Sequence, residues 1–222
     1  MALVRIGAAE RLVRAAEDEL IEGGGLLEMQ AVARRAKVSV GLAYHHFGSK
    51  AGLIAAVVER FYDRLEEVAF SPSKLVSRDF VGREKERISA YVFFHYDHPF
   101  APLVVGPLSR APEVLDVEVA FTRRQLTAGA YNLRAAQRAG VIPKDLAPRL
   151  TIALMIGGIR QALIGALTTG PRPDPAQLTD GIWTFVAGAL RLSAQASNAQ
   201  DGPAPVGPPQ GAAASDGARP AT

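Results

Sequence analysis

The chain of 222 residues contains no cysteine. This absence excludes disulfide bonds, thiolate nucleophiles and zinc–thiolate sites, and it suits the reducing cytoplasm, where we expect the protein to act. The first twenty residues mix charged and apolar positions, so we expect no secretion signal. The most apolar stretch, residues 150–167, is broken by Arg160 and Gln161 and carries three glycines. We therefore expect a buried, closely packed helix there and no membrane partner.

Enzyme signatures are lacking as well. No Ser/His/Asp order, paired-carboxylate constellation, phosphate-binding loop or nucleotide fingerprint stands out in the sequence. His95 and His98, three residues apart, could share a metal on one helix face, but no second pair of ligands is evident. We therefore expect no enzyme activity, no cofactor and no metal site.

A large excess of one charge is also missing, because 25 Lys and Arg residues face 22 Asp and Glu residues. The net charge of +3 does not by itself predict a nucleic-acid partner. The distribution is more informative. Residues 29–56 contain no acidic residue and four cations, namely Arg34, Arg35, Lys37 and Lys50. This segment is a local cationic region.

No alternating strand pattern is present, and the apolar periodicity predicts an all-α protein. A first helix should end at Gly23, Gly24 and Gly25, and the stretch Ser71-Pro72-Ser73 should mark a domain boundary. We expect a small module at residues 1–70, a helical domain at 71–196, and a disordered Gly/Pro/Ala-rich tail at 197–222. Further helices are expected at about 29–36, from Ser39 to about His46, and at 51–68, 78–97, 112–139, 146–168 and 175–195, with a shorter segment at 99–110.

The small module contains two short helices joined by a tight turn, which is the pattern of a helix-turn-helix. Ser39 and Ser49 are good N-caps for the second short helix and for the long helix after it. Inward-facing residues should be Val38, Ala43 and Phe47, with Val32, Ala33 and Ala36 from the first short helix. Outward-facing residues should then be Val40, Leu42, Tyr44, His45 and the amine of Lys50. This face offers small apolar groups beside polar tips, which suits a DNA groove with phosphates on either side.

The stretch AVARRAKVSVGLAYHHFGSKAGLIAAVV resembles the DNA-binding head of the TetR (tetracycline-repressor) family of bacterial transcription regulators. The resemblance covers about residues 8–67. It implies a homodimer that binds a roughly palindromic operator on double-stranded DNA, usually as a repressor, and leaves it when a small molecule enters the C-terminal domain. It also implies phosphate contacts by Tyr44, His45 and Lys50, a base-facing patch at residues 40–42, and structural roles for His46 and Phe47. The expected DNA-binding residues are Gln30, Lys37, Ser39, Val40, Gly41, Leu42, Tyr44, His45 and Lys50.

Three positions depart from the family pattern. Glu28 and Met29 stand where Ser or Thr is common; Glu28 can still cap the helix, but it repels DNA, and Met29 cannot donate a hydrogen bond. Lys37 stands where the turn usually has glycine. A lysine at positive φ costs about 1 kcal/mol, part of which a phosphate contact would recover.

The C-terminal domain should hold an effector pocket, because polar or large residues interrupt otherwise apolar helices there. The alternative is that these residues are core, exposed or paired, and residues 84–87 are expected to form a solvated face. The candidate pocket residues are Tyr91, Phe94, His95, His98, Arg123, Asn132, Arg160, Gln161 and Trp183.

The last two helices, at about 146–168 and 175–195, are apolar and rich in glycine, which predicts a homodimer interface through them. Two other functions stay open at this point. The chain could be an all-α enzyme or ligand carrier whose head only packs, or a regulator that responds to a protein partner and to no small molecule.

Overall fold

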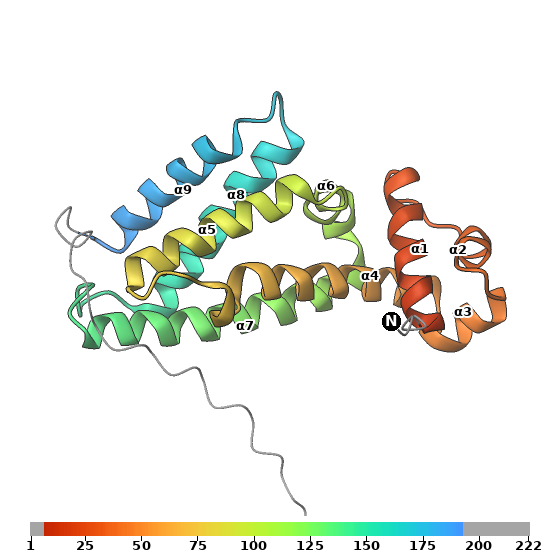
Figure 1. Cartoon of the computed structure of the whole chain (residues 1–222), viewed down its shortest axis with the longest axis horizontal. Coiled ribbons are helices and arrows are strands. Elements are labelled where there is room, and N and C mark those ends of the chain that lie inside the picture. The colour runs from red at the N-terminus through yellow and green to blue at the C-terminus, as the bar shows by residue number, and fades with distance from the viewer. Residues whose placement is uncertain (1–6, 193–222) are drawn as a thin grey trace, which may run out of the picture.

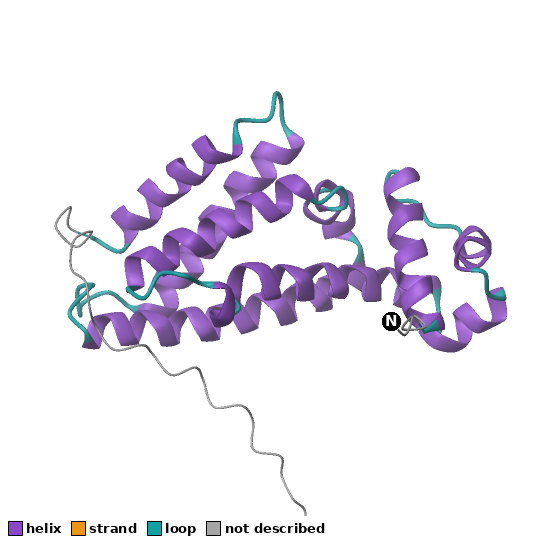
Figure 2. Ribbon diagram, in the orientation of Figure 1, coloured by secondary structure: helices purple, strands orange, loops and turns teal. Residues whose placement is uncertain are grey.

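A computed structural model of the chain describes residues 7–192, and every regular element in that range is a helix (Figures 1 and 2). The all-α prediction is therefore confirmed. The predicted tail at residues 197–222 lies outside the described residues. The α-helices are α1 (Ala8–Glu22), α2 (Met29–Ala36), α3 (Val40–Phe47), α4 (Lys50–Leu65), α5 (Phe80–Asp97), α6 (Ala101–Val105), α7 (Pro112–Arg138), α8 (Pro148–Thr168) and α9 (Pro175–Ala189).

Helix starts follow local capping chemistry. The hydroxyl oxygens of Ser39 and Ser49 accept hydrogen bonds from the backbone N–H groups of Leu42 and Gly52, at 3.1 and 3.0 Å. Asp79 and Asp174 cap α5 and α9 in the same way. A side-chain oxygen at this position satisfies a backbone donor that the helix leaves unpaired. Both predicted serine caps are confirmed.

The long helix after the head ends differently from the prediction. We expected it to run to Val68, but α4 ends at Leu65 and continues as the π-helical turn η1 (Glu66–Phe70). The wider turn rotates the apolar stripe, so that Val68 is exposed and Ala69 is buried. The 3₁₀ turn η2 (Pro72–Lys74) follows, and another, η3 (Pro107–Arg110), follows α6. Single π-turns inside helices occur often at functional sites.

Helix α9 is also shorter than predicted, because it ends at Ala189 and not near residue 195. Arg191 adopts a left-handed conformation, with φ 51°. The N–H groups of Arg191 and Leu192 donate to Gly188 O and Ala187 O, each at 3.0 Å. This pair of bonds closes the helix end.

The molecule has a head (α1–α3) and a body (α5–α9), and α4 runs from one to the other beside α7 (Figure 1). One apolar core joins Leu12 of α1 to Phe61 of α4, Phe100 beside α6, and Leu163 of α8. A second core lies among α5, α7, α8 and α9. The predicted boundary near residue 71 falls in the turns η1 and η2, while the first core passes from head to body through α4. The head is therefore packed against the body and does not hang from a linker.

Helix α8 is long and apolar enough to cross a membrane by length and composition, with 28% of its most apolar window buried. Its Arg160 pairs with Glu118 of α7, and α7 and α9 both pack against it. These contacts are those of a bundle helix within a globular protein.

Candidate nucleic-acid interface and ligand cavity

The turn between α2 and α3 has the strained geometry that the sequence predicts. Lys37 is left-handed, with φ 56° and ψ 48°. The N–H of Val38 donates to Ala33 O at 3.0 Å, and that of Lys37 donates to Arg34 O at 3.2 Å. These two bonds form the usual glycine-type helix end without a glycine. Lys37 keeps its side chain exposed at the turn.

The start of α2 differs from the expectation. Glu28 occupies the N-cap position, but its side chain makes no capping hydrogen bond, so the prediction that it caps the helix was wrong. Met29 is buried in the core. Gln30 is exposed in the first turn of α2. The first turn of α2 thus exposes a carboxylate and an amide.

Helix α3 presents its predicted outward face. Ala43 is buried, and Val38 and Phe47 pack partly buried against the head core. Tyr44 is 46% exposed, and His45 is exposed beside it. Val40 and Leu42 are half-buried at the start of the helix, where Gly41 is exposed. The surface offers one phenol and one imidazole beside small apolar groups.

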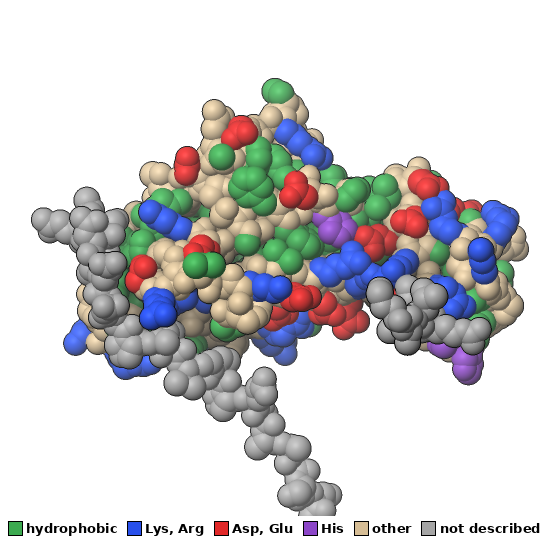
Figure 3. All heavy atoms as spheres, viewed as in Figure 1, with side chains coloured by type: hydrophobic (Ala, Val, Ile, Leu, Met, Phe, Trp, Pro, Cys, Tyr) green, Lys and Arg blue, Asp and Glu red, His purple; other side chains and the backbone are tan. Residues whose placement is uncertain are grey.

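His46 was expected to pack or to orient its neighbours. Its side chain is exposed, and its ring makes only side contacts with His45 and Phe47, at centroid distances of 5.8 and 6.1 Å. Figure 3 shows a histidine on the surface of the head. Both histidines of α3 are therefore on the outside of the molecule.

The cationic region is smaller in the structure than in the sequence. Arg35 pairs with three acids of α1: it bonds Glu22 at 2.8 Å and lies 3.7 and 3.5 Å from Asp18 and Glu19. Arg34, Lys37 and Lys50 are exposed and have no ion-pair partner within residues 7–192. Lys50 lies in the first turn of α4, where backbone N–H groups and the helix dipole also favour an anion. Three cations of this segment are therefore available to contact the phosphate backbone of DNA.

Comparison with known proteins identifies the family. The profile described as "Bacterial regulatory proteins, tetR family" matches residues 12–57. The HTH-type transcriptional regulator BetI of Rhizobium meliloti (strain 1021) is 34% identical over 158 residues, which are 65% of this chain and 72% of BetI. This chain belongs to the TetR family.

Solved structures of TetR-like proteins have the same fold. The fatty acid degradation regulator FadR of Bacillus halodurans matches 86% of this chain and 100% of its own, with a TM-score of 0.69 and 17% identity. FadR of Bacillus subtilis, solved in complex with stearoyl-CoA, matches 81% of this chain and 97% of its own, with a TM-score of 0.66 and 17% identity. As a TetR-family protein, the chain is a DNA-binding transcriptional regulator.

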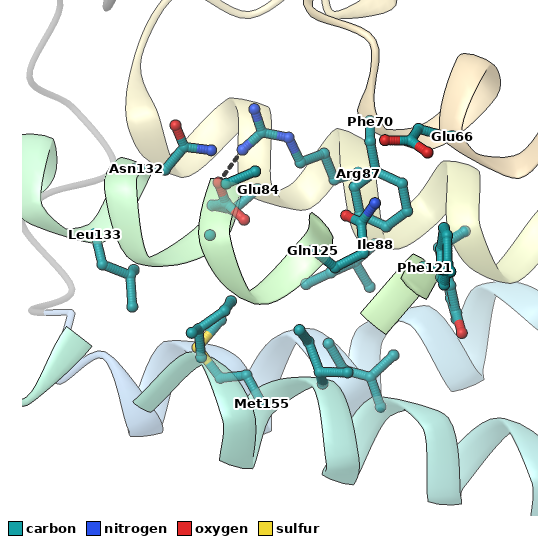
Figure 4. A pocket seen from close by; sticks show the side chains of 16 residues that line it. Glu66, Phe70, Glu84, Arg87, Ile88, Phe121, Gln125, Asn132, Leu133 and Met155 are labelled. Carbon is teal, nitrogen blue, oxygen red and sulfur yellow. Dashed lines mark hydrogen bonds and ion pairs between the residues drawn. The ribbon is translucent and has the colours of Figure 1, made fainter. Parts of the chain in front are cut away.

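The body of this TetR-family protein contains a cavity of about 180 Å³ between α5, α7 and α8, next to the π-turn that follows α4 (Figure 4). Apolar side chains form most of its wall. The lining residues are Glu66, Phe70, Glu84, Arg87, Ile88, Tyr91, Phe121, Gln125, Ala128, Gly129, Asn132, Leu133, Ile152, Met155, Ile156 and Ile159.

Two of the nine predicted pocket residues, Tyr91 and Asn132, line this cavity. The other seven lie elsewhere. Arg123 and Gln161 are exposed, and Trp183 lies under the ammonium of Lys85, 5.0 Å from the ring centroid. Phe94, His95 and His98 pack around Phe61 of α4, and Arg160 pairs with Glu118. The sequence pointed to α5, α7 and α8, which do line the cavity, and to α9, which does not; most of the residues it named lie outside the wall.

His95 is a core residue whose ring is 2% exposed. Its Nδ1 lies 2.8 Å from Tyr91 O and donates to it. Burial lowers the pKa of His95 to about 4, so the ring is neutral at pH 7. Within residues 7–192 there is no group of three or more His, Cys, Asp or Glu side chains that could hold a metal ion.

Sequence reasoning missed the charged pair in the cavity wall. Residues 84–87 were expected to be a solvated face, but the side chains of Glu84 and Arg87 are only 14% and 15% exposed and form an ion pair. Figure 4 shows the Arg87 guanidinium directed at Glu84. Burial raises the pKa of Glu84, and Arg87 counteracts this. Their i, i+3 spacing occurs on exposed helices too, so only the packing of α7 and α8 reveals the burial.

A buried polar network connects α4 to the cavity helices. The hydroxyl of Tyr62 donates to Glu118 Oε1 at 3.2 Å, and Arg160 Nη2 donates to both carboxylate oxygens at 3.0 and 2.9 Å. Burial raises the pKa of Tyr62, with the Glu118 charge adding to the effect, so Tyr62 stays a donor. Its ring also stacks on Phe121 of the cavity wall, at 4.4 Å.

The opposite face of α4 is joined to the head. Arg60 Nη1 lies 2.8 Å from Glu10 Oε1 of α1, within ion-pair distance although the angle does not suit a hydrogen bond. Arg64 and His98 lie 3.7 and 3.6 Å from Glu17 Oε1 of α1. Burial lowers the pKa of His98, and Arg64 adds to the shift. Helix α4 thus contacts α1 on one side and the cavity wall on the other.

Proposed function

We propose that this regulator is a homodimeric repressor of the bacterial cytoplasm, with no catalytic activity, and that a small molecule in the body cavity releases it from a palindromic operator. The observation that carries the proposal is the position of α4. This helix begins with an exposed lysine beside α3 and leads into a turn that lines the cavity. One element therefore touches both the DNA-facing surface and the effector site.

On the DNA side, α3 enters the major groove. Tyr44, His45 and Lys50 contact phosphates on the two sides of the groove, and Lys37 adds a cation at the turn. Val40, Gly41 and Leu42 approach the base edges, where apolar side chains can contact thymine methyl groups. Ser39 fixes the start of the helix, and Gln30 is the nearest amide for a base contact. The exposure of Lys37, Tyr44, His45 and Lys50, with Val40 and Leu42 half-buried in α3, supports this arrangement.

The dimer forms through α8 and α9. Leu150 and Leu154 on α8 are 61% and 62% exposed, and Phe185 on α9 is also exposed. A Cβ on Gly158 would lie 2.9 Å from the Phe185 ring, so the two helices already pack closely at that point. Large apolar side chains left in water on adjacent helices favour a second copy of the chain as their cover. A two-fold dimer places two α3 helices on one face of a duplex.

Effector release follows from the contacts of α4. A ligand in the cavity touches Phe70 of the π-turn and Phe121, which stacks on Tyr62 of α4. Tilting α4 changes the position of α1 through Glu10 and Glu17, and with it the separation of the two α3 helices. The ligand needs only to prefer the geometry that does not fit the operator. The complex of Bacillus subtilis FadR with stearoyl-CoA supports the idea that this fold accommodates a small molecule.

The test is a mobility shift with an operator selected from random duplex DNA, followed across salt concentrations. We expect steep weakening with salt, and the substitution Lys50→Ala should reduce affinity about tenfold for all sequences and lower the salt slope by about 1. The control is Lys144→Ala, an exposed lysine in the α7–α8 connection at the far end from the head (Figure 1). An unchanged slope for Lys50→Ala would remove its phosphate contact, and salt-insensitive binding would contradict the DNA arrangement as a whole.

A further inference from the structure

We infer that the body cavity selects a neutral, largely apolar molecule of about one ring, held by a hydrogen bond to Gln125 or Asn132. This inference rests on the proposed function, because it assigns a chemical class to the effector. It is carried by three properties of the cavity: its size, the pairing of its charges and its unpartnered amides.

The size limits the ligand. A cavity of about 180 Å³ is smaller than the pockets of roughly 300–1,000 Å³ that hold drug-sized ligands. A protein cavity of about 150 Å³ lined by Leu, Ile and Phe binds benzene. The close approach of α7 and α8 fixes the floor, since a Cβ on Gly129 would lie 2.4 Å from Ile152. The space therefore fits one ring with a short substituent.

The charges in the wall are already compensated. Glu84 pairs with Arg87 inside the wall, and Glu66 pairs with Arg124 at 3.0 Å on the α7 side. A charged ligand would have to break a pair or remain uncompensated among apolar side chains, and both cost free energy. A neutral ligand leaves both pairs intact.

The polar groups without partners are neutral. Gln125 is only 8% exposed, and its side chain has no hydrogen-bond partner within residues 7–192. The amide of Asn132, two turns further along α7, is also unpaired in that range, as is the hydroxyl of Tyr91. Figure 4 labels Gln125 and Asn132 among the side chains that line the cavity. An amide at the cavity wall with no protein partner can donate to or accept from a ligand hydroxyl or carbonyl.

The remaining wall is apolar on every helix that contributes to it. Phe70 comes from the π-turn, Ile88 from α5, Phe121 from α7, and Met155 and Ile159 from α8. An apolar ring contacts these residues, while one polar substituent reaches Gln125 or Asn132. Small-molecule sites typically combine an apolar wall with a few polar groups that fix the orientation of the ligand.

Four molecules of nearly the same shape test the inference: benzyl alcohol, toluene, benzoate and benzylamine. Binding to the full-length protein is measured by ligand-detected NMR titration at pH 7, without DNA. We expect benzyl alcohol to bind at least about tenfold more tightly than either charged analogue, and about fivefold more tightly than toluene. Tighter binding of benzoate or benzylamine would overturn the inference, as would failure of all four to bind.

Two variants locate the hydrogen bond. Gln125→Leu or Asn132→Leu should reduce the preference for benzyl alcohol over toluene, and the double variant should remove it. Gln161→Leu is the matched control, because Gln161 is exposed on α8 and does not line the cavity. A preference that persists in the folded double variant would contradict the role of the amides.

The titration is independent of operator binding. Benzyl alcohol that binds with the expected preference but does not release the operator would contradict the proposed function and leave the chemical class intact. Release of the operator by a charged molecule that competes with benzyl alcohol would contradict the chemical class and leave the proposed function intact.

Discussion

The head and the body of this protein place their functional side chains in different ways. In the head, the candidate DNA-binding residues lie within a stretch of 21 residues, from Gln30 to Lys50, and two serine caps and one turn position them. In the body, the cavity wall combines residues from η1, α5, α7 and α8, separated by up to 93 positions from Glu66 to Ile159. Local hydrogen bonds organise the first site, and tertiary packing creates the second.

The two regions also differ in the side chains that they expose. The head exposes polar tips on a short helix, which suits a charged polymer in water. The body exposes Leu150 and Leu154 on a long apolar helix, which suits a protein surface. The three predictions that follow test how far the two regions depend on each other.

The largest effect is expected from a change in the body that never touches DNA. Leu154→Glu places a charge on the exposed apolar face of α8 and should give a monomer. With only one α3 per molecule, operator affinity should fall at least about a thousandfold. Light scattering after size exclusion measures the mass, and a mobility shift measures the affinity.

The control for this prediction is Leu26→Glu, since Leu26 is an exposed leucine of the head outside the proposed dimer face. It should leave the mass unchanged. If Leu154→Glu stays dimeric with full affinity, the head would not depend on α8 in the way proposed.

An intermediate effect is expected at His95, where the body packs on α4. The unfolded ring protonates near pH 6.5, while burial lowers its pKa to about 4 in the folded protein. Between these values the unfolded state binds the extra proton, so stability is retained above pH 6.5 and falls as pH decreases. At pH 5 the free energy of unfolding is lower by about 2 kcal/mol because of His95.

Between pH 7 and pH 5, the free energy of unfolding of the variant His95→Phe should fall by about 2 kcal/mol less than that of the parent protein. Urea unfolding measures this difference. His45→Phe, at an exposed histidine of α3, is the control and should follow the parent. Equal losses in all three proteins would show that His95 does not cause the acid sensitivity.

The smallest effect compares one helix end in each region. Lys37 and Arg191 are both left-handed at φ 56° and 51°, and both close a helix with the same pair of backbone hydrogen bonds. Replacing either by glycine should add about 1 kcal/mol to the free energy of unfolding, and raise Tm by about 2–4 °C in a protein of this size.

Only Lys37→Gly should also weaken DNA binding and lower its salt slope, because only Lys37 lies beside α3. Arg191→Gly additionally loses an exposed ion pair with Asp145, which contributes little. Equal DNA affinity in the two variants would assign Lys37 a purely structural role.

Much of the fold and the head could be predicted from the sequence, because the signals are local. Ser39 and Ser49 cap their helices as predicted, and Lys37 adopts the positive φ that its place in the turn demands. Tyr44 and His45 are exposed on α3 as expected. The missing cap at Glu28 and the pairing of Arg35 with acids of α1 concern side-chain contacts and not the backbone.

The cavity could not be predicted in the same way. Glu84 and Arg87 have the spacing of an ordinary surface pair, and Gln125 is one polar residue among several on α7. Nothing within either helix indicates which face the other helices cover. The histidines that looked like pocket residues instead pack on Phe61, a residue more than thirty positions earlier in the chain.

The sequence by itself determined the all-helical class, most helix ends, the helix-turn-helix and the family, because each depends on residues within a few turns of one another. Only the tertiary structure decided that Arg35 forms ion pairs with the acids of α1 and that α4 ends in a π-turn beside a cavity. It also decided that two amides of α7 line this cavity without a protein partner. These features depend on which helix faces meet, and that is set by the packing of the whole chain.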